Sequence, residues 1–364
     1  MEKLLYKIAL TKIPKVGAKT ARDLVSYCGG VENVFRATKK ELLAIPGIGL
    51  QIAKCVLEQN VLSSAERELK FIEQHQIQPL FFLDAAYPAR LKHHNDSPVM
   101  LYYKGNADLN HGRVIAIVGT RKPTARGIAS CEQLIEGLLP YQPLIVSGLA
   151  YGVDVTAHRK CLEVGIETVG IMGHGLNQIY PPAHRKTASE MIENGGLLTE
   201  YTHDTAIDPR HFPMRNRIIA GLCDALIVVE TKNSGGSMIS ANIANGYNKD
   251  VFAFPGRVSD KSSEGCNKLI KSHKAALIES AEDIAYVMRW EKSDSQRTIQ
   301  KQLFVELSER ERKVVSLLRS SDNVSIDKIV YEQQISTSQA AAVLLELELK
   351  GLVKPQPGNR FVLV

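Results

Sequence analysis

Residues 212–222, FPMRNRIIAGL, place two arginines beside one asparagine directly before an apolar run. The run predicts a helix, and Arg215 and Arg217 would lie in its first turn. Helix starts usually carry Asp, Glu, Ser or Thr, because free N–H groups and the helix dipole give that end partial positive charge. The two arginines therefore predict an external polyanion at this point, and Phe212 could stack on one of its bases.

Loops rich in glycine and serine follow the neighbouring apolar runs. Glycine lets backbone amides approach a ligand closely, and amides at a helix N-terminus attract phosphate. One such loop is weak evidence, whereas several with cations beside them predict a phosphate-rich ligand. The loops are 119–127, 147–154, 173–186, 231–240 and 255–271, and the cations are Arg121, Arg126, Arg185, Lys186, Arg215, Arg217 and Lys268.

The alternative for the two arginines is an internal role. Arg215 or Arg217 could pair with Glu200 or Glu230 at a strand end, with Phe212 in the core. Either arginine taken alone favours this interpretation. The whole set of loops and cations favours the ligand.

Six apolar runs predict the elements that position these loops. They are rich in Val and Ile, do not alternate with polar residues, and are separated by lengths that fit one helix each. This pattern is typical of a parallel sheet covered on both faces, the doubly wound α/β fold. Such sheets bind ligands beyond the carboxyl ends of their strands. The runs are 114–119, 143–150, 167–173, 196–201, 225–231 and 250–256.

Composition sets broad limits on the protein. The 364 residues are 44% hydrophobic and 23% charged, which is typical of a globular chain with two or three domains. The formal net charge of +6 mildly favours an acidic partner. Six cysteines without a CxxC pair predict reduced thiols in the cytoplasm. No apolar run reaches the roughly 18 residues of a membrane helix, and the first residues do not resemble a signal peptide.

An internal repeat marks the N-terminal part. Residues 13–21 (IPKVGAKTA) and 45–53 (IPGIGLQIA) share Ile, Pro, Gly and Ala at equal spacing. The pattern resembles the helix-hairpin-helix motif, in which turn amides can bind a DNA phosphate. Lys15, Lys19 and Lys54 are compatible with phosphate binding, and a packing or protein-contact role is equally compatible.

The central part resembles the DNA-processing protein A (DprA, also called Smf) family. Residues 87–106 resemble the segment that leads into the family's central domain. The matching stretches occur in the family's order across about 112–275: IVGTRKPTARG, VSGLAYGVDVTAH, GHGLNQIYPPAHR, GGLLTEY, FPMRNRIIAGL, IVVETKNSGGSMISANIA, VFAFPG and EGCNKLI.

The resemblance implies an extended Rossmann-like domain that binds single-stranded DNA without sequence preference and uses no cofactor. It also implies a homodimer that protects incoming DNA and loads the RecA recombinase in natural transformation. By this analogy the DNA-binding residues are Arg121, Ser147, Gly148, Arg215, Asn216, Arg217, Ser234, Gly235, Gly236, Ser237 and Lys268. Arg185, Lys186, Phe212 and Asn267 complete the candidate set.

Two positions depart from the family pattern. Tyr151 stands where the family usually has arginine, which removes one cation from that loop. GTR at 119–121 replaces the more common GSR, a conservative change.

The C-terminal part predicts a winged helix. Ser308 and Glu311 form a capping-box pattern, two further helical stretches follow, and 352–364 resembles a hairpin. The helix that would enter the major groove carries one cation, Lys350, and two acids, so we favour a protein-contact or packing role over duplex reading. The predicted domains are 1–66 (helix-hairpin-helix, SAM-like), 67–290 (Rossmann-like), a linker at 291–303, and 304–364 (winged helix).

Catalytic and metal interpretations are weaker. Asp154 and His158 share a helix face but are too few for a metal site, and residues 203–211 predict a solvated loop. The enzyme alternative is a nucleotide phosphoribohydrolase of the LOG type. That family resembles PGGxGTxxE, yet no carboxylate occurs between Ser234 and Asn248 here, so binding is favoured over hydrolysis. A dinucleotide-dependent enzyme is disfavoured because G-x-G-x-x-G is absent after the first strand.

Overall fold

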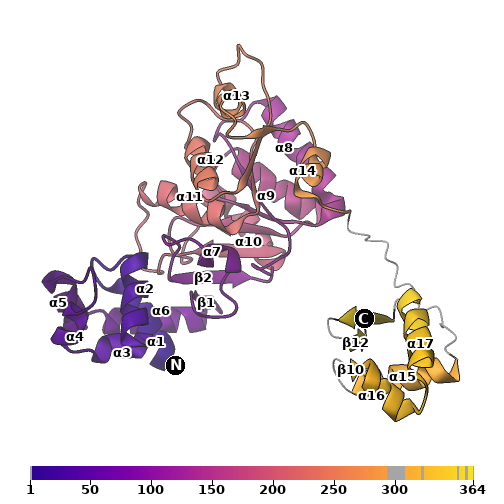
Figure 1. The fold of residues 1–364 in the computed structure, drawn as a ribbon. Helices are drawn as coiled ribbons and strands as arrows, with labels where there is room; N and C mark the ends of the chain where they lie inside the picture. The colour runs from indigo at the N-terminus through magenta and orange to yellow at the C-terminus, as the bar shows by residue number, and fades with distance from the viewer. Residues whose placement is uncertain (1, 293–307, 321–323, 351, 357–359, 364) are drawn as a thin grey trace. The chain divides into compact units, whose positions relative to one another are not determined.

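The computed structural model describes residues 2–292, 308–320, 324–350, 352–356 and 360–363. The chain forms two compact units, residues 1–293 and 294–364. The first unit contains the N-terminal helices and a nine-stranded sheet, and the second contains a small three-stranded sheet with three helices (Figure 1).

The N-terminal helices contain the predicted repeat. Gly17 and Gly49, 32 positions apart, cap the two equivalent helices α2 and α5 with nearly the same extended backbone, at φ −85° and −88°. Lys15 and Gly47 both adopt positive φ, 67° and 83°, in the preceding turns. The helices are α1 (Glu2–Lys12), α2 (Ala18–Cys28), α3 (Val31–Arg36), α4 (Lys39–Leu43), α5 (Leu50–Glu58) and α6 (Leu62–Gln74).

The sheet of the first unit has the order β1-β2-β6-β5-β4-β3-β7-β8-β9. The strands from β6 through to β9 are parallel, which confirms the doubly wound prediction. The six predicted runs form β3 (Val114–Val118), β4 (Leu144–Ser147), β5 (Thr168–Ile171), β6 (Gly195–Thr199), β7 (Ala225–Val228) and β8 (Asp250–Ala253).

Three strands at the sheet edges were not predicted. β1 (Gln78–Phe81) and β2 (Met100–Gly105) add an antiparallel pair beside β6, and β9 (Ala276–Leu277) extends the opposite edge. β1 and β2 do not belong to the repeating strand–helix pattern, which is why that pattern did not reveal them. β9 follows α13 in that pattern but is only two residues long, too short to stand out as an apolar run.

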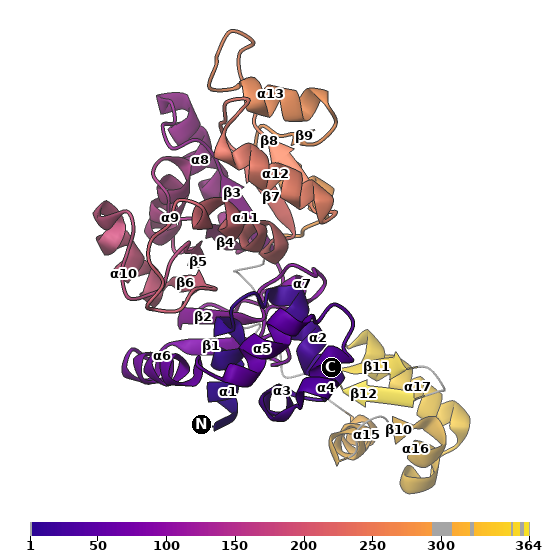
Figure 2. The same ribbon diagram turned by 90° about the vertical axis from the view of Figure 1, so that its left-hand side faces the viewer.

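Helices cover both faces of the sheet (Figure 2). One face packs on α7 (Ala89–Lys92), α11 (His211–Leu222), α12 (Gly236–Gly246) and α13 (Glu264–Lys271). The other face packs on α8 (Ala125–Leu138), α9 (Val153–Val164) and α14 (Ala281–Met288), while α10 (Arg185–Glu193) covers β5 and β6. Alternate residues of β3 enter the two cores, with Ala116 in one and Ile117 in the other.

The N-terminal helices share a core with the sheet edge. Phe81, Met100 and Tyr102 of β1 and β2 pack among the buried residues of α1 to α6. The boundary predicted at residue 66 lies inside α6. The remaining domain limits stay predictions.

The second unit has the element order predicted for a winged helix. It contains α15 (Glu309–Ser320), β10 (Val324–Ser325), α16 (Ile326–Gln333), α17 (Thr337–Leu349), β11 (Val353–Gln356) and β12 (Arg360–Leu363). Ser308 and Glu311 form the predicted capping box, with the Glu311 amide 3.3 Å from Ser308 Oγ. Glu311 Oε2 accepts from the Ser308 amide at 2.7 Å, and Glu311 Oε1 accepts from Lys350 Nζ at 2.5 Å. The charge of Lys350 is therefore paired inside this unit. Residues 293–303 of the predicted linker lie outside the described residues.

No helix in the described part of the chain is long and apolar enough to span a membrane.

Gly195 allows β6 to lie against β5, because its φ of +136° disfavours other residues and an added Cβ would lie 1.9 Å from Thr168 O. We expect Gly195→Ala to lower the free energy of unfolding of the first unit by more than about 2 kcal/mol. The measurement is urea unfolding followed by the fluorescence of Trp290, the single tryptophan, which packs against Tyr141 in this unit. Gly112→Ala, where a Cβ meets no atom within 4 Å, is the control and should change little. Equal stability of both variants would contradict this account.

Candidate nucleic-acid interface

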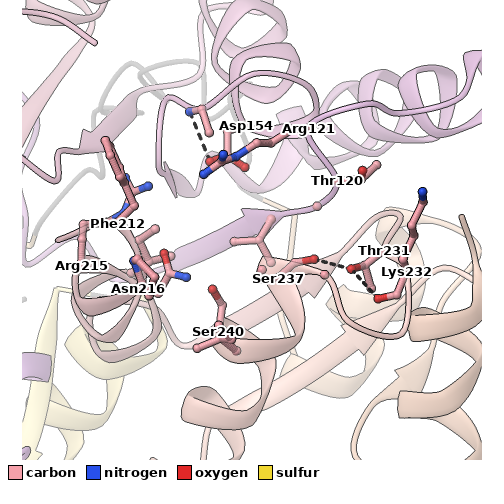
Figure 3. A pocket seen from close by; sticks show the side chains of 18 of the residues that line it. Thr120, Arg121, Asp154, Phe212, Arg215, Asn216, Thr231, Lys232, Ser237 and Ser240 are labelled. Atoms are coloured by element: carbon pink, nitrogen blue, oxygen red, sulfur yellow. Dashed lines mark hydrogen bonds between the residues drawn. The ribbon is translucent and has the colours of Figure 1, made fainter. Parts of the chain in front are cut away.

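A cavity of about 450 Å³ lies at the carboxyl ends of β3 and β7. From β3 the chain builds the sheet in one direction through β4, β5 and β6. It then returns to place β7 on the opposite side of β3. Such a reversal of strand order opens a crevice between the loops of adjacent strands. In Figure 3, Phe212, Arg215 and Asn216 lie on one side of this central cavity, and Thr231, Lys232 and Ser237 lie on the other.

The β7–α12 loop forms one wall of the central cavity. It contains Ser234 and Gly235, and α12 begins at Gly236. Ser237 Oγ donates to Thr231 Oγ1 at 2.7 Å, and a Cβ on Gly235 would lie 2.2 Å from the same hydroxyl. The loop is thus closely packed. The Met238 amide already donates to Gly235 O at 3.0 Å, and the amides of Gly236 and Ser237, which precede the first intrahelical bond, are suited to bind an anion.

Three cations and one acid line the central cavity. Arg121 and Lys232 are exposed on the loops after β3 and β7, whereas Arg215 is buried. Asp154, in the first turn of α9, accepts from the Ala150 amide at 3.4 Å. Burial raises the pKa of Asp154, and the positive charge of Arg215 opposes that rise. The balance of charge favours an anionic ligand.

Arg215 is held by backbone carbonyls. Its Nη1 donates to Gly148 O at 2.7 Å and to Ile171 O. A Cβ on Gly148 would lie 2.4 Å from the guanidinium, so only glycine fits there. Burial lowers the pKa of Arg215 to about 10, which still leaves it charged at neutral pH. Arg215 therefore places a fixed positive charge in the wall of the cavity.

Arg217 has the internal role that was the alternative interpretation. Its Nη2 lies 2.6 Å from Glu200 Oε2, and the two side chains are 17% and 15% exposed. Arg217 Nη1 and Glu200 Oε1 are buried without a hydrogen-bond partner among the described residues. Arg217 is not a residue of the central cavity, so the expectation that it lines a DNA pocket lacks support from the geometry.

The predicted start of the helix was wrong. α11 begins at His211, so Arg215 and Arg217 lie in its second turn and not its first. Pro213 is accepted in the first turn because a first-turn residue needs no backbone N–H for an intrahelical bond. The first turn of α11 contains no acidic residue, as predicted, but the two arginines follow that turn and do not belong to it.

Phe212 is half-buried in the wall of the central cavity. A Cβ on Gly173 would lie 3.0 Å from its ring, and its centroid is 5.8 Å from that of Tyr180. One part of the ring is thus packed while it also lines the cavity beside Asn216.

The structure brings together about half of the candidate set. Arg121, Phe212, Arg215, Asn216, Ser234, Gly235, Gly236 and Ser237 line the central cavity. Ser147 and Gly148 lie behind it, where Ser147 Oγ donates to Ile117 O at 2.6 Å.

Four other candidates lie elsewhere. Arg185 and Lys186 begin α10, where Lys186 is 3.8 Å from Glu190. Asn267 uses both ends of its amide on the backbone of Gly256, and Lys268 Nζ donates to Asn233 Oδ1 at 2.9 Å. Tyr151, at the position where the family usually has arginine, is half exposed with its ring edge-on to His184.

Lys232, Thr120 and Asp154 also line the central cavity, although none of them was among the predicted binding residues. Lys232 stands inside the quoted loop TKNSGG, so its charge could have been counted. The carboxylate of Asp154 faces the cavity from another element, which only the fold reveals. His158, one turn later, is buried with Nδ1 2.7 Å from Thr168 Oγ1, as expected of a packing residue.

The predicted solvated loop at 203–211 is partly docked. His203 Nδ1 lies 2.5 Å from Glu68 Oε2, a buried carboxylate of α6, and Lys12 of α1 lies 3.0 Å from Asp204. Glu68, His203 and Asp204 lie close enough together to hold a metal ion, but each of them already takes part in an ion pair or hydrogen bond. The loop is therefore attached to the N-terminal helices at one end, and Arg210 at the other end is exposed.

Comparison with known families identifies the central part of the chain. A family model described as DNA recombination-mediator protein A matches residues 78–289. The chain belongs to this family, the DprA/Smf family. A DprA winged helix domain matches residues 302–359, and a helix-hairpin-helix motif matches residues 8–59.

Several DprA and Smf proteins are similar to the chain. Protein Smf of Synechocystis is 29% identical, and the match covers 98% of this chain and 98% of that protein. The DNA processing protein DprA of Streptococcus pneumoniae is 41% identical over 56% of this chain and 71% of its own. An X-ray structure of DprA from that organism matches with TM-score 0.65 at 32% identity, over 79% of this chain and 98% of that one.

A further structure concerns the single-stranded DNA binding mode of DprA from Helicobacter pylori. It matches with TM-score 0.54 at 30% identity, over 59% of this chain and 98% of that chain.

The internal role of Arg217 is tested by stability. Arg217→Ala would leave the carboxylate of Glu200 buried without a counter-charge, so we expect a loss of roughly 2–4 kcal/mol in the free energy of unfolding. Urea unfolding followed by Trp290 fluorescence measures this loss. Arg217→Leu combined with Glu200→Leu should recover much of it, because neither charge remains.

The matched control for this test is Arg210→Ala. Arg210 is exposed and pairs with Asp208 on the surface, so its removal should change stability by less than about 1 kcal/mol. If Arg217→Ala is as stable as the control, Arg217 does not have the internal role.

Proposed function

We propose that this chain binds single-stranded DNA without sequence preference, through the central cavity. The observation that supports this most is the combination in one cavity of the α12 first-turn amides, the cations Arg121, Lys232 and Arg215, and the ring of Phe212. Amides and cations bind phosphate, and an aromatic ring stacks on any base, so neither requires a particular sequence. The structure named for single-stranded DNA binding in the H. pylori relative supports the same ligand.

The different members of the central cavity would share the work of binding. Arg121 and Lys232 are exposed and would contact phosphates directly, whereas Arg215 is fixed by carbonyls and would supply a constant potential. Charge-assisted contacts of the first kind are strong because the donor is ionised. Asn216 adds an uncharged amide that can hydrogen-bond to sugar, phosphate or base edge.

Membership of the family extends the proposal beyond DNA binding. We infer a homodimer in the cytoplasm that protects incoming DNA and loads RecA during natural transformation. Binding without catalysis belongs to the same proposal. The winged helix would serve protein contact or packing, because Lys350, the cation next to α17, is paired with Glu311. The helix-hairpin-helix repeat retains two exposed helix starts, at Gly17 and Gly49, that could contact a backbone.

The ligand preference is tested by electrophoretic shift at several salt concentrations. We expect tighter binding to a single-stranded oligonucleotide than to a duplex of the same length. The slope of log K against log salt should correspond to roughly 3–6 neutralised phosphates. Phe212→Ala should weaken single-strand binding by about 1–3 kcal/mol if the ring carries a base, and Arg121→Ala should weaken it and reduce the salt slope.

Folding stability separates this result from a structural effect. Arg121 is exposed, so Arg121→Ala should unfold at the same urea concentration as the unmodified protein. Equal affinity for duplex, or affinity independent of salt, would contradict the proposal.

The alternative function is hydrolysis of a nucleotide. It is tested because one carboxylate, that of Asp154, lies in the cavity. Glycoside hydrolysis generally uses two carboxylates, and among the described residues Asp154 is the one acid that lines this cavity. We therefore expect no release of adenine from adenosine monophosphate by the full chain. The measurement is chromatography of the reaction against a heat-killed control. Release that Asp154→Asn abolishes would establish the hydrolase instead.

A further inference from the structure

A second cavity, of about 610 Å³, borders the central cavity. Lys232 lines both of them, so the loop after β7 separates the two. The outer cavity, as we name it, is enclosed by the start of α8 at residues 124–130 and by the loop after β8 at residues 254–263. None of its lining residues except Lys232 belongs to the central cavity.

The outer cavity carries excess positive charge. Four exposed cations line it, and among the described residues none of them has an ion pair: Arg126, Lys232, Arg257 and Lys261. Two acids face them, Glu230 and Asp260. Glu230 is buried and already accepts from the Thr124 amide at 2.8 Å and the Thr124 hydroxyl at 3.0 Å. A ligand here would therefore meet mainly positive charge.

The walls of the outer cavity are fixed before any ligand binds. The start of the β8 loop is held by the Asn267 amide group, which makes two hydrogen bonds with the Gly256 backbone at 3.1 and 3.0 Å. Further along, the Asp260 amide donates to Arg257 O and the Ser263 amide to Asp260 O, both at 3.0 Å. On the opposite wall, Thr124 caps α8 while Glu230 holds Thr124. The backbone of both walls thus needs little further ordering when a ligand binds.

The lining also indicates which part of a nucleic acid would bind. It is dominated by cations and serines, and its one aromatic side chain, Phe254, packs against the sheet core. Without a free ring the outer cavity offers no platform for stacking a base, so it suits the sugar-phosphate backbone.

We propose that the outer cavity binds the backbone of the same single strand that the central cavity holds, with Lys232 contacting the phosphate between them. This inference rests on the proposed function, because it adds a second segment to that strand. A free phosphate or nucleotide would meet the same cations. The strand is favoured because Lys232 makes the two cavities adjacent, so that both can act on one chain of phosphates.

The test is the length dependence of affinity in the full chain carrying Arg257→Ala and Lys261→Ala together. An oligonucleotide of about four nucleotides, the lower end of known site sizes, should bind this variant as it binds the unmodified protein. One of about sixteen nucleotides should bind roughly tenfold more weakly at low salt. Its salt slope should fall by about 1.4, because each phosphate neutralised on a single strand contributes about 0.7.

The matched control removes the same charges from α6. Arg67→Ala with Lys70→Ala deletes one exposed arginine and one exposed lysine, and should leave both oligonucleotides unaffected. Arg126→Ala, on a helix and not on the loop, should reproduce the length dependence in smaller measure. Trp290 fluorescence during urea unfolding checks that each variant folds.

Four results would overturn the inference. Three are undiminished binding of the long strand, an equal loss in the α6 control, and an equal loss for the short strand. The fourth is that adenosine monophosphate competes with the oligonucleotides for the unmodified protein but not for the variant, without length dependence, which would identify a free nucleotide site. Failure of the proposed function is distinct, because the unmodified protein would then bind neither oligonucleotide.

Discussion

The buried guanidinium of Arg215 is the interaction on which the arrangement of the central cavity depends. Its bonds to the carbonyls of Gly148 and Ile171 join α11 to the ends of β4 and β5. An apolar side chain at this position would offer those carbonyls no donor, and a displaced guanidinium would remove the charge beneath the cavity. The same group therefore fixes the helix that carries Phe212 and Asn216 and makes the cavity positive. Gly148 is glycine because this guanidinium occupies the space of a Cβ.

Arg217 extends the same attachment to a third strand. Glu200, its partner, directly follows β6, so two arginines of one helix connect it to the ends of β4, β5 and β6 in succession. The loop between Glu200 and α11 is attached in turn to α6 through His203 and Glu68. The N-terminal helices and the cavity wall are thus connected through polar contacts of α11 and of the loop that precedes it. Removing either partner of the Arg217–Glu200 pair would leave the other charge buried without a counter-charge.

Much of this fold could be predicted from the sequence, since buried parallel strands and glycine loops have direct signals in residue type and spacing. The edge strands β1 and β2 had none, because Pro79 and the tyrosines of β2 do not repeat the pattern of the central strands. At the site, three of the five predicted loops, 119–127, 147–154 and 231–240, contribute residues to the central cavity, while 173–186 and 255–271 do not. The partners of the arginines were predicted only in part. Glu200 could be named as a candidate because it is charged. The carbonyls that hold Arg215 could not, because every residue has one and only the fold selects which face the guanidinium.

The size of the central cavity favours single-stranded over duplex nucleic acid, whereas its positive charge favours any nucleic acid. Its volume of about 450 Å³ is in the range of small-ligand sites, so a base or a nucleotide can enter and a stacked duplex cannot. The bases of a duplex are stacked on one another and cannot enter the cavity. A duplex could therefore contact only the exposed cations, Arg121 and Lys232. In the proposed complex a single strand would turn a base towards Phe212 while its phosphate meets the first turn of α12 on the opposite wall (Figure 3). On this proposal the half-buried ring of Phe212 and the buried charge of Arg215 would serve only a nucleic acid whose bases are free.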